Sequence, residues 1–486
     1  MRRPFALTVL CVAVLLLAGC QAPGSPTDQT DPSGDDLTPD SSAVDYGNDG
    51  SAPAAPDEDR LGYENGYWYN ESLSVTTDDG LNETERDAVV ARTMARVERI
   101  RGLEFQETVP VSVISRAEYR NNTAGGEAGE SLRRFDNAKF EALFFIGEDR
   151  DSIAVQNSNR GESVLGYYSS RRGEIVIVSD SETPTISRGT LAHELVHALQ
   201  DQQFGLASDA RTRDEVQGRN GLVEGDAVAV TQAYTGRCGE EWDCIDRPDT
   251  SSGGGGDRHF GINFMQYFPY SDGPGLISDL REREDWSAVN GAYDDYPDGA
   301  VEVTYPERYP GWEPESVSLA DRSSDDWERV RPSTDRNRPD YAVVGPSAIA
   351  SSMAYTIADD YNESAVVGTR DVINYEDGSL DSDDPYNYDL PATDGWEGGR
   401  MHVYDNGSET AYVWKTTWTS EADAREFADA WAAVIAHWGG TRTAAGQWVI
   451  EEGSPYTDAI AVRIDGDTVT IVNAPTTDEL DEVHDA

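Results

Sequence analysis

The stretch TLAHELVHALQDQQF, Thr190 to Phe204, places two histidines and a glutamate in the middle of an otherwise apolar helical sequence. The whole chain has only 6 histidines, and His193 and His197 lie four positions apart here. On a helix this spacing puts both imidazoles on one face, with Cβ atoms about 6 Å apart. Both rings can then reach one metal ion at about 2.0–2.1 Å. Because burying such groups without partners is costly, the stretch predicts a metal-binding helix.

The neighbouring acids complete a candidate catalytic centre. Glu194 follows the first histidine, which suits a general base that takes a proton from water activated by the ion. A catalytic zinc also needs a third protein ligand and an open position. Glu224 lies 27 residues after His197 in GLVEGDAVAV, within a second helix expected from about Asp214 to Tyr234. We therefore predict a Zn²⁺ ion held by His193, His197 and Glu224.

Simpler interpretations of these residues stay open. The two histidines can be satisfied core residues, and Glu224 can be a carboxylate at a helix edge. Asp226 is expected to point away from Glu224, either behind the ligands or to the surface. Asp201, one turn beyond His197, either orients an imidazole or is a solvated acid.

The charge of the chain is strongly negative. It contains 91 acidic and 38 basic residues, a formal net charge of -53, and its only lysines are Lys139 and Lys415. This charge excludes nucleic acid as a partner, since binding it requires basic patches. Screening at high salt makes such self-repulsion tolerable, so the composition predicts a halophilic protein.

The N-terminus has the pattern of an export signal. Arg2 and Arg3 precede an apolar run that is too short to span a bilayer and that ends in Leu17-Ala18-Gly19-Cys20. This pattern resembles a lipoprotein processing site, with a lipid on Cys20 anchoring the chain to the extracellular face of the membrane; the alternative is an ordinary cleaved signal peptide. Outside the cell, the pair Cys238 and Cys244 is expected to form a disulfide.

Several segments together resemble one family. The run from His193 to His197, followed by a distant Glu224, resembles the gluzincin pattern of thermolysin-like zinc metallopeptidases. LAHELVHALQDQQF, LVEGDA, FPYSDGPGLISDL, YPERY and GWEGGRMHVY also resemble, in the same order, exported zinc peptidases predicted in archaea and bacteria, including haloarchaeal surface proteins. The resemblance covers most of residues 160–432. It implies His193, His197 and Glu224 as zinc ligands and Glu194 as the catalytic acid and base.

The resemblance also leaves two expectations about substrate. A strand edge before the motif helix would hold a peptide, either Gly173 to Asp180 or its hairpin partner. Relatives often carry a histidine where this chain has Tyr305, whose hydroxyl is a candidate donor to the oxyanion. A packed aromatic is the simpler interpretation of Tyr305, and His259 is the other candidate donor.

The expected fold class is α+β. It comprises a gluzincin-like core, built from a β-hairpin or sheet, the motif helix and the Glu224 helix, and a small C-terminal α+β unit. Expected elements include a helix at 82–100, a strand at 109–115, a hairpin within 164–180 and a helix at 421–437. The expected segments are a lipoprotein signal at 1–20, a disordered acidic tether at 21–60, a metallopeptidase-like domain at 61–320, a helical and loop connection at 321–400, the C-terminal unit at 401–475 and a frayed acidic tail at 476–486.

The predicted function is zinc-dependent hydrolysis of a peptide or protein substrate. One alternative is a non-catalytic surface binding or assembly protein with a structural metal site, which would need a fourth ligand. Another is a surface module without metal. The distance between the Glu224 carboxylate and the two imidazoles distinguishes these alternatives.

Overall fold

The computed structural model describes residues 55–56, 60–75, 77, 79–123, 128–181, 183–245, 258–332, 339–362, 364–376, 378–381 and 384–484. The predicted signal at 1–20, its Cys20 and nearly all of the tether at 21–60 lie outside the described residues, as do the last two positions of the tail. The described chain is α+β, as predicted.

A small mixed sheet lies at the N-terminal end of the molecule. Its strands are β3 (Val111–Ile114), β4 (Gly166–Ser169) and β5 (Glu174–Val178), in the order β3-β5-β4. The expected hairpin is confirmed, because β4 and β5 pair antiparallel and Gly173 takes a positive φ of 61° in the turn. A further short hairpin joins β1 (Tyr63–Glu64) to β2 (Tyr67–Trp68).

Four helices precede the motif helix in the sequence: α2 (Glu83–Arg101), α3 (Arg116–Thr123), α4 (Glu130–Ala142) and α5 (Ser152–Ser163). The first was expected from its apolar spacing. Asn82 caps it, and the Asn82 and Glu85 side chains satisfy each other's backbone N–H groups in a capping box.

The motif helix and its neighbours form the middle of the molecule. Ser187 caps the motif helix α6, and Gly205 follows it with a positive φ of 73°. A capping box of Thr212 and Glu215 starts the Glu224 helix α7. The elements are α6 (Arg188–Phe204), α7 (Arg213–Gly236), α8 (Phe260–Ser271), α9 (Gly273–Glu284), α10 (Trp286–Ala292), α11 (Ala300–Thr304) and the 3-10 helix η2 (Pro306–Arg308).

The C-terminal part contains a seven-stranded antiparallel sheet in the order β11-β12-β13-β14-β10-β9-β6. It extends beyond the predicted span of 401–475, because β9 begins at Trp396 and β6 pairs with its far end. The elements are β6 (Glu328–Arg329), α12 (Pro346–Tyr355), β7 (Tyr375–Glu376), β8 (Ser379–Leu380), β9 (Trp396–Asp405), β10 (Thr410–Trp418), α13 (Glu421–His437), β11 (Gly440–Arg442), β12 (Trp448–Ile450), β13 (Ala459–Asp465) and β14 (Thr468–Ala474).

The acidic tail differs from the expected frayed segment. Residues Leu480–Val483 form the short helix α14, and both end residues are fully buried. They pack with Trp327 and Tyr404 on one face of the large sheet. Burial of these two apolar side chains stabilises the packing of this charged segment against the fold.

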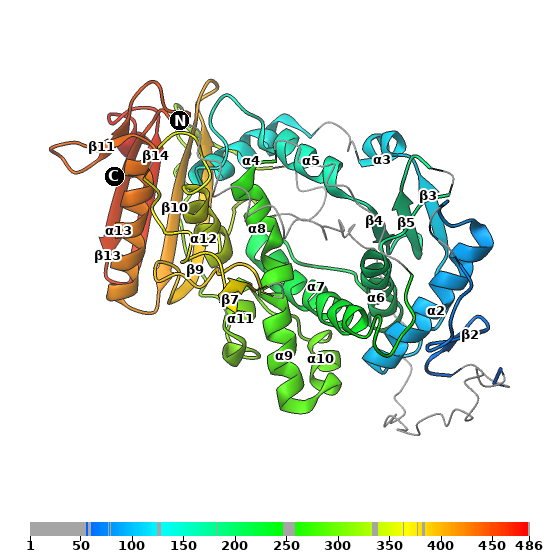
Figure 1. The fold of residues 1–486 in the computed structure, drawn as a ribbon. Coiled ribbons are helices and arrows are strands. Elements are labelled where there is room, and N and C mark those ends of the chain that lie inside the picture. The colour runs from blue at the N-terminus through cyan, green and yellow to red at the C-terminus, as the bar shows by residue number, and fades with distance from the viewer. Residues whose placement is uncertain are drawn as a thin grey trace.

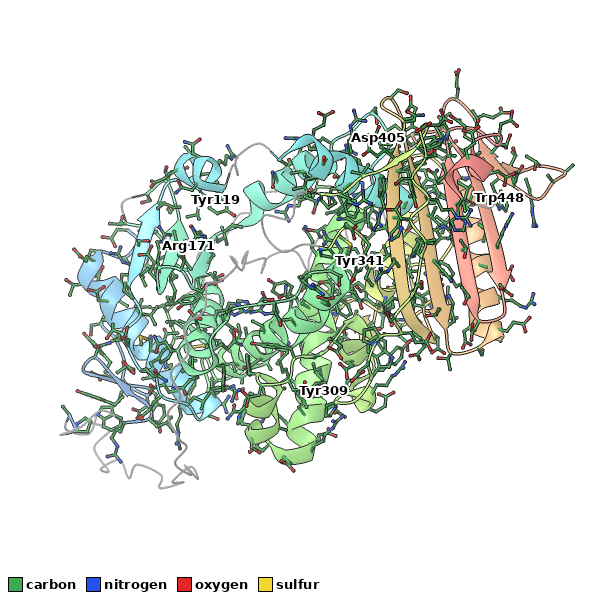
Figure 2. All side chains as sticks on the ribbon, turned by 180° about the vertical axis from the view of Figure 1, so that it is seen from behind. Tyr119, Arg171, Tyr309, Tyr341, Asp405 and Trp448 are labelled. Carbon is green, nitrogen blue, oxygen red and sulfur yellow. A yellow bond between two sulfur atoms is a disulfide. The ribbon has the colours of Figure 1, made fainter. Side chains whose placement is uncertain are left out.

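The two sheets lie at opposite ends of the molecule, with α6 to α9 between them (Figure 1). Figure 2 shows the same arrangement from behind, with Tyr119 and Arg171 at one end and Asp405 and Trp448 at the other. One large apolar core runs from α4 through α8 to the C-terminal sheet, and a second lies between α2, β5 and α6. Among the described helices, none is both long enough and apolar enough to cross a membrane.

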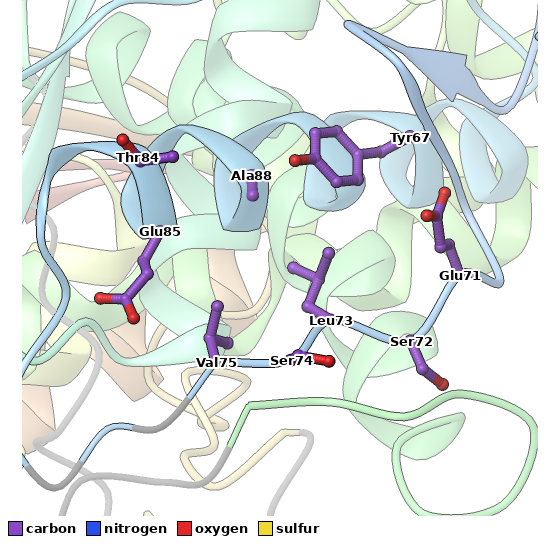
Figure 3. Close-up of a pocket in the computed structure, with 9 residues that line it drawn as sticks. All are labelled: Tyr67, Glu71, Ser72, Leu73, Ser74, Val75, Thr84, Glu85 and Ala88. Atoms are coloured by element: carbon purple, nitrogen blue, oxygen red, sulfur yellow. The ribbon is translucent and has the colours of Figure 1, made fainter.

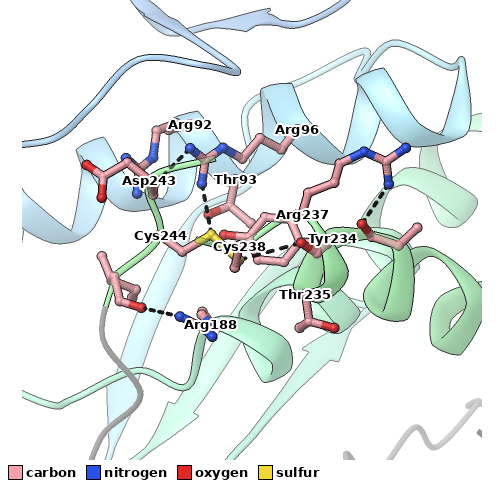
Figure 4. Close-up of a disulfide and its surroundings, with 12 residues drawn as sticks. Arg92, Thr93, Arg96, Arg188, Tyr234, Thr235, Arg237, Cys238, Asp243 and Cys244 are labelled. Carbon is pink, nitrogen blue, oxygen red and sulfur yellow. Dashed lines mark hydrogen bonds between the residues drawn. A yellow bond between two sulfur atoms is a disulfide. The ribbon is translucent and has the colours of Figure 1, made fainter. Parts of the chain in front are cut away.

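The expected disulfide is present, since Cys238 and Cys244 are bonded with an S–S distance of 2.06 Å. It closes a loop after α7 that covers Arg96 of α2 (Figure 4). The fully buried Arg96 guanidinium donates to the Asp243 carbonyl at 2.9 Å and to the Cys244 sulfur at 3.5 Å. The bridge therefore fixes the loop that satisfies a buried cation.

Candidate metal centre

Three side chains from two helices converge between α6 and α7. The Nε2 atoms of His193 and His197 are 3.1 Å apart, and each is 3.2 Å from Oε2 of Glu224. All three residues are almost fully buried. The described residues thus place the three predicted zinc ligands around one point.

The spacing of these atoms fits a tetrahedral ion. A tetrahedron whose corners lie about 2.0–2.1 Å from its centre has edges of about 3.3 Å. The three edges of 3.1–3.2 Å are close to that length. Two imidazoles and one carboxylate are also the donor set of several catalytic zinc sites.

The His193 imidazole is suited to act as a neutral ligand. Burial lowers the pKa of His193, and this effect outweighs the opposing hydrogen bond that the ring donates to Glu224. A neutral imidazole offers a lone pair, which a protonated ring does not. The ring of Tyr270 in α8 stacks beside His193, with ring centroids 6.0 Å apart.

Glu194 is held beside the three ligands. Its Oε2 accepts a hydrogen bond of 2.7 Å from the backbone N–H of Tyr168, in strand β4. Its Oε1 is buried and has no hydrogen-bond partner among the residues that the structure describes. Burial raises the pKa of Glu194 to about 8, although His197 and the Tyr168 N–H act in the opposite direction. A buried carboxylate with a raised pKa and one oxygen free of hydrogen bonds, here called the vacant oxygen, is suited to exchange protons near neutral pH.

The edge of the small sheet borders this centre. β5 lies in the middle of that sheet, between β3 and β4. The edge strand next to the centre is therefore β4, the hairpin partner of β5. The expectation that Gly173 to Asp180 provides the edge is therefore wrong, because β3 and β4 occupy both of its sides.

The acids behind the ligands have separate roles. Asp226 is fully buried and accepts hydrogen bonds from Gln200 at 3.3 Å and Tyr293 at 2.8 Å. It therefore lies behind the ligands and not on the surface, which were the two expected positions. Asp201 is not simply solvated. It accepts from the Tyr168 hydroxyl at 2.8 Å and from the Leu206 N–H at 2.9 Å.

The two candidate oxyanion donors are bound elsewhere. His259 caps α8, where its Nε2 donates to the Phe145 carbonyl at 2.6 Å and its Nδ1 accepts from the Ile262 N–H. Both ring nitrogens are used, so His259 as an oxyanion donor is wrong. The Tyr305 hydroxyl donates to Asp389 at 2.5 Å, and the catalytic role of Tyr305 stays a prediction.

Sequence reasoning missed Gln200, Tyr168 and Tyr270. Gln200 had a signal, because it lies three positions after His197 and therefore on the same helix face. Tyr168 contributes its backbone N–H, which no side-chain pattern reveals. Tyr270 comes from α8, which is distant in sequence from the motif.

Two other features lie apart from this centre. A hollow of about 300 Å³ between the segment 71–75 and α2 is lined by residues such as Tyr67, Leu73 and Ala88, and by none of the three ligands (Figure 3). A second group of acids, Glu141, Glu148 and Asp458, links α4 to the C-terminal sheet.

Residues 328–484 match the model of a domain of unknown function, DUF8575. This span contains all seven strands of the C-terminal sheet, β6 included, and it contains none of the residues of the metal centre. The chain matches no curated protein and no solved structure. The match therefore describes the C-terminal part alone and gives it no activity.

Proposed function

We propose that the chain is a zinc-dependent metallopeptidase of gluzincin type, exported and anchored through a lipid on Cys20. The observation that carries the proposal is the triangle of His193, His197 and Glu224 donor atoms, with edges of 3.1–3.2 Å. A zinc ion bound there supplies a Lewis acid that polarises a carbonyl group and lowers the pKa of water.

Glu194 supplies the proton transfer in this proposal. The vacant Oε1 takes a proton from the attacking water and passes it to the leaving amine of the cleaved peptide. The Tyr168 N–H holds the other oxygen, so the carboxylate keeps one orientation through both transfers.

The edge strand β4 is the candidate surface for an extended peptide. Tyr168 directs its N–H toward Glu194 and away from β5, so the outer edge of β4 borders the catalytic carboxylate. A peptide added to that edge gains main-chain hydrogen bonds without a requirement for particular side chains. The proposed substrate is therefore a peptide or protein segment that can adopt an extended conformation.

A structural metal site fits these residues less well. Closed structural zinc sites have four protein ligands, whereas the described residues bring three together here. The vacant oxygen of Glu194 also has no purpose in a closed site.

The variant Glu194→Gln tests the mechanism. An amide keeps the shape of the side chain but cannot take a proton, so we expect zinc binding at the wild-type level and hydrolysis reduced roughly 10²–10⁴-fold. Zinc content and cleavage of a quenched fluorescent peptide library, both in molar salt, measure the two effects. Cleavage at the wild-type rate by the zinc-loaded variant would rule out the mechanism.

A further inference from the structure

Gln200 contacts the ring nitrogen of His197 that faces away from Glu224. Its Oε1 lies 2.9 Å from Nδ1 of His197, and its side chain is 2 % exposed. The Nε2 of Gln200 lies 2.9 Å from the Val223 carbonyl and 3.3 Å from Oδ2 of Asp226. Gln200 therefore bridges one ligand helix, α6, to the other, α7.

These contacts fix the orientation of the amide. A carbonyl and a carboxylate only accept hydrogen bonds, so the NH₂ group of Gln200 must face Val223 and Asp226. The amide oxygen then faces His197 and can only accept, so the proton of the imidazole lies on Nδ1. The lone pair of His197 is left on Nε2, which is the atom 3.2 Å from Glu224.

The amide is itself held from behind. Asp226 accepts from Nε of Arg101 in α2 at 3.0 Å and from the Tyr293 hydroxyl at 2.8 Å. Asp226 and Arg101 are both almost fully buried. Helices α2, α6 and α7 therefore all contribute to the position of the Gln200 side chain.

We infer that Gln200, held by the Val223 carbonyl and Asp226, is a positioning residue that keeps the proton of His197 on Nδ1 and presents Nε2 to the metal. The inference rests on the proposed metal centre and adds the group that prepares one of its ligands. Such partners of ligand imidazoles commonly raise metal affinity by about 10–100-fold.

The variant Gln200→Leu tests the inference in the full chain. Leucine has a similar size but no acceptor, so we expect Zn²⁺ affinity, measured by competition with a chelator, to fall about 10–100-fold. The visible absorption spectrum of the Co²⁺-loaded protein should also change, because His197 is free to rotate or change tautomer. The control is Gln203→Leu, on the same helix as Gln200. It removes a hydrogen bond to the Glu104 carbonyl and should leave both measurements unchanged.

The outcomes separate this inference from the proposed function. A wild-type chain that binds neither Zn²⁺ nor Co²⁺ contradicts the proposed function, and with it the inference. A wild-type chain that binds both, with affinity and spectrum unchanged in Gln200→Leu, overturns the positioning role alone.

A second measurement decides the matter if Gln200→Leu does not fold. Imidazole ¹⁵N shifts of the metal-free wild-type chain report which nitrogen of His197 is protonated, with the signal assigned by its loss in His197→Gln. We expect the proton on Nδ1. A proton on Nε2 would overturn the inference.

Discussion

At the scale of residues, the support behind the metal ligands depends on one buried carboxylate, Asp226, and its partners. Asp226 has no exposed surface, and its carboxylate receives Arg101, Tyr293 and Gln200. Removing one partner of such a pair leaves a charge buried without compensation, which costs more than the pair contributes. The site is therefore sensitive to changes that do not touch the metal ligands.

Arg101→Leu should lower the free energy of unfolding by about 3–5 kcal/mol, because it strands the Asp226 carboxylate in the core. Denaturant unfolding at one fixed salt concentration measures the loss. The control is Arg425→Leu, which breaks an exposed pair with Glu421 and should cost at most about 0.5 kcal/mol. Equal losses in the two variants would contradict this description of the buried pair.

At the scale of elements, helix α7 is placed by glycines. A Cβ at Gly225 would lie 2.5 Å from the backbone of Gly273, and a Cβ at Gly221 would lie 2.4 Å from the Val303 side chain. α7 therefore approaches α9 and α11 more closely than any side chain allows. Gly225 directly follows Glu224, so this packing sets where the third ligand lies.

Gly225→Ala should push α7 away from α9 and displace Glu224. We expect a loss of about 1–3 kcal/mol in the free energy of unfolding, which is the usual cost of overpacking, and weaker Zn²⁺ binding. Gly236→Ala is the matched control on the same helix, since a Cβ there meets nothing within 4 Å. A Gly225→Ala protein with unchanged stability and zinc affinity would show that the contact is not limiting.

Elements with a strong local signal could be predicted from the sequence. The helix Glu421–His437 follows its capping Ser420, and the hairpin turn needs the positive φ of Gly173. The ligands were predictable because their spacing reflects helix geometry. The pairing of β6 with β9 was not, since two residues carry no periodic signal and their partners, Asp405 for Glu328 and Tyr404 for Arg329, are far along the chain. For Asp201 the sequence left two interpretations open, an acid that orients an imidazole and a solvated acid. The structure places the buried amide of Gln200 against Nδ1 of His197 instead, and no side-chain pattern distinguishes these cases.

At the scale of the whole molecule, the large negative net charge controls how the stability of the fold depends on salt. The formal net charge of -53 acts against the folded state through self-repulsion. The Debye length falls from about 10 Å at 0.1 M salt to about 3 Å at 1 M, so salt removes most of this repulsion. The stability of the fold should therefore depend on ionic strength.

We expect the melting temperature to rise steadily as KCl increases from 0.1 M to 2 M, measured by circular dichroism. Sucrose at matched osmolality is the control, because it is excluded from the protein surface but does not screen charge, and it should produce a smaller rise. A melting temperature that is constant or falls with KCl would contradict the halophilic prediction.

The most direct test of the central claim is the zinc content of the purified chain. If His193, His197 and Glu224 hold one ion, metal analysis should find about one zinc per wild-type chain and strongly reduced zinc in Glu224→Ala at the same protein concentration. No zinc in the wild-type chain after zinc loading, or the same zinc content in both proteins, would contradict the claim.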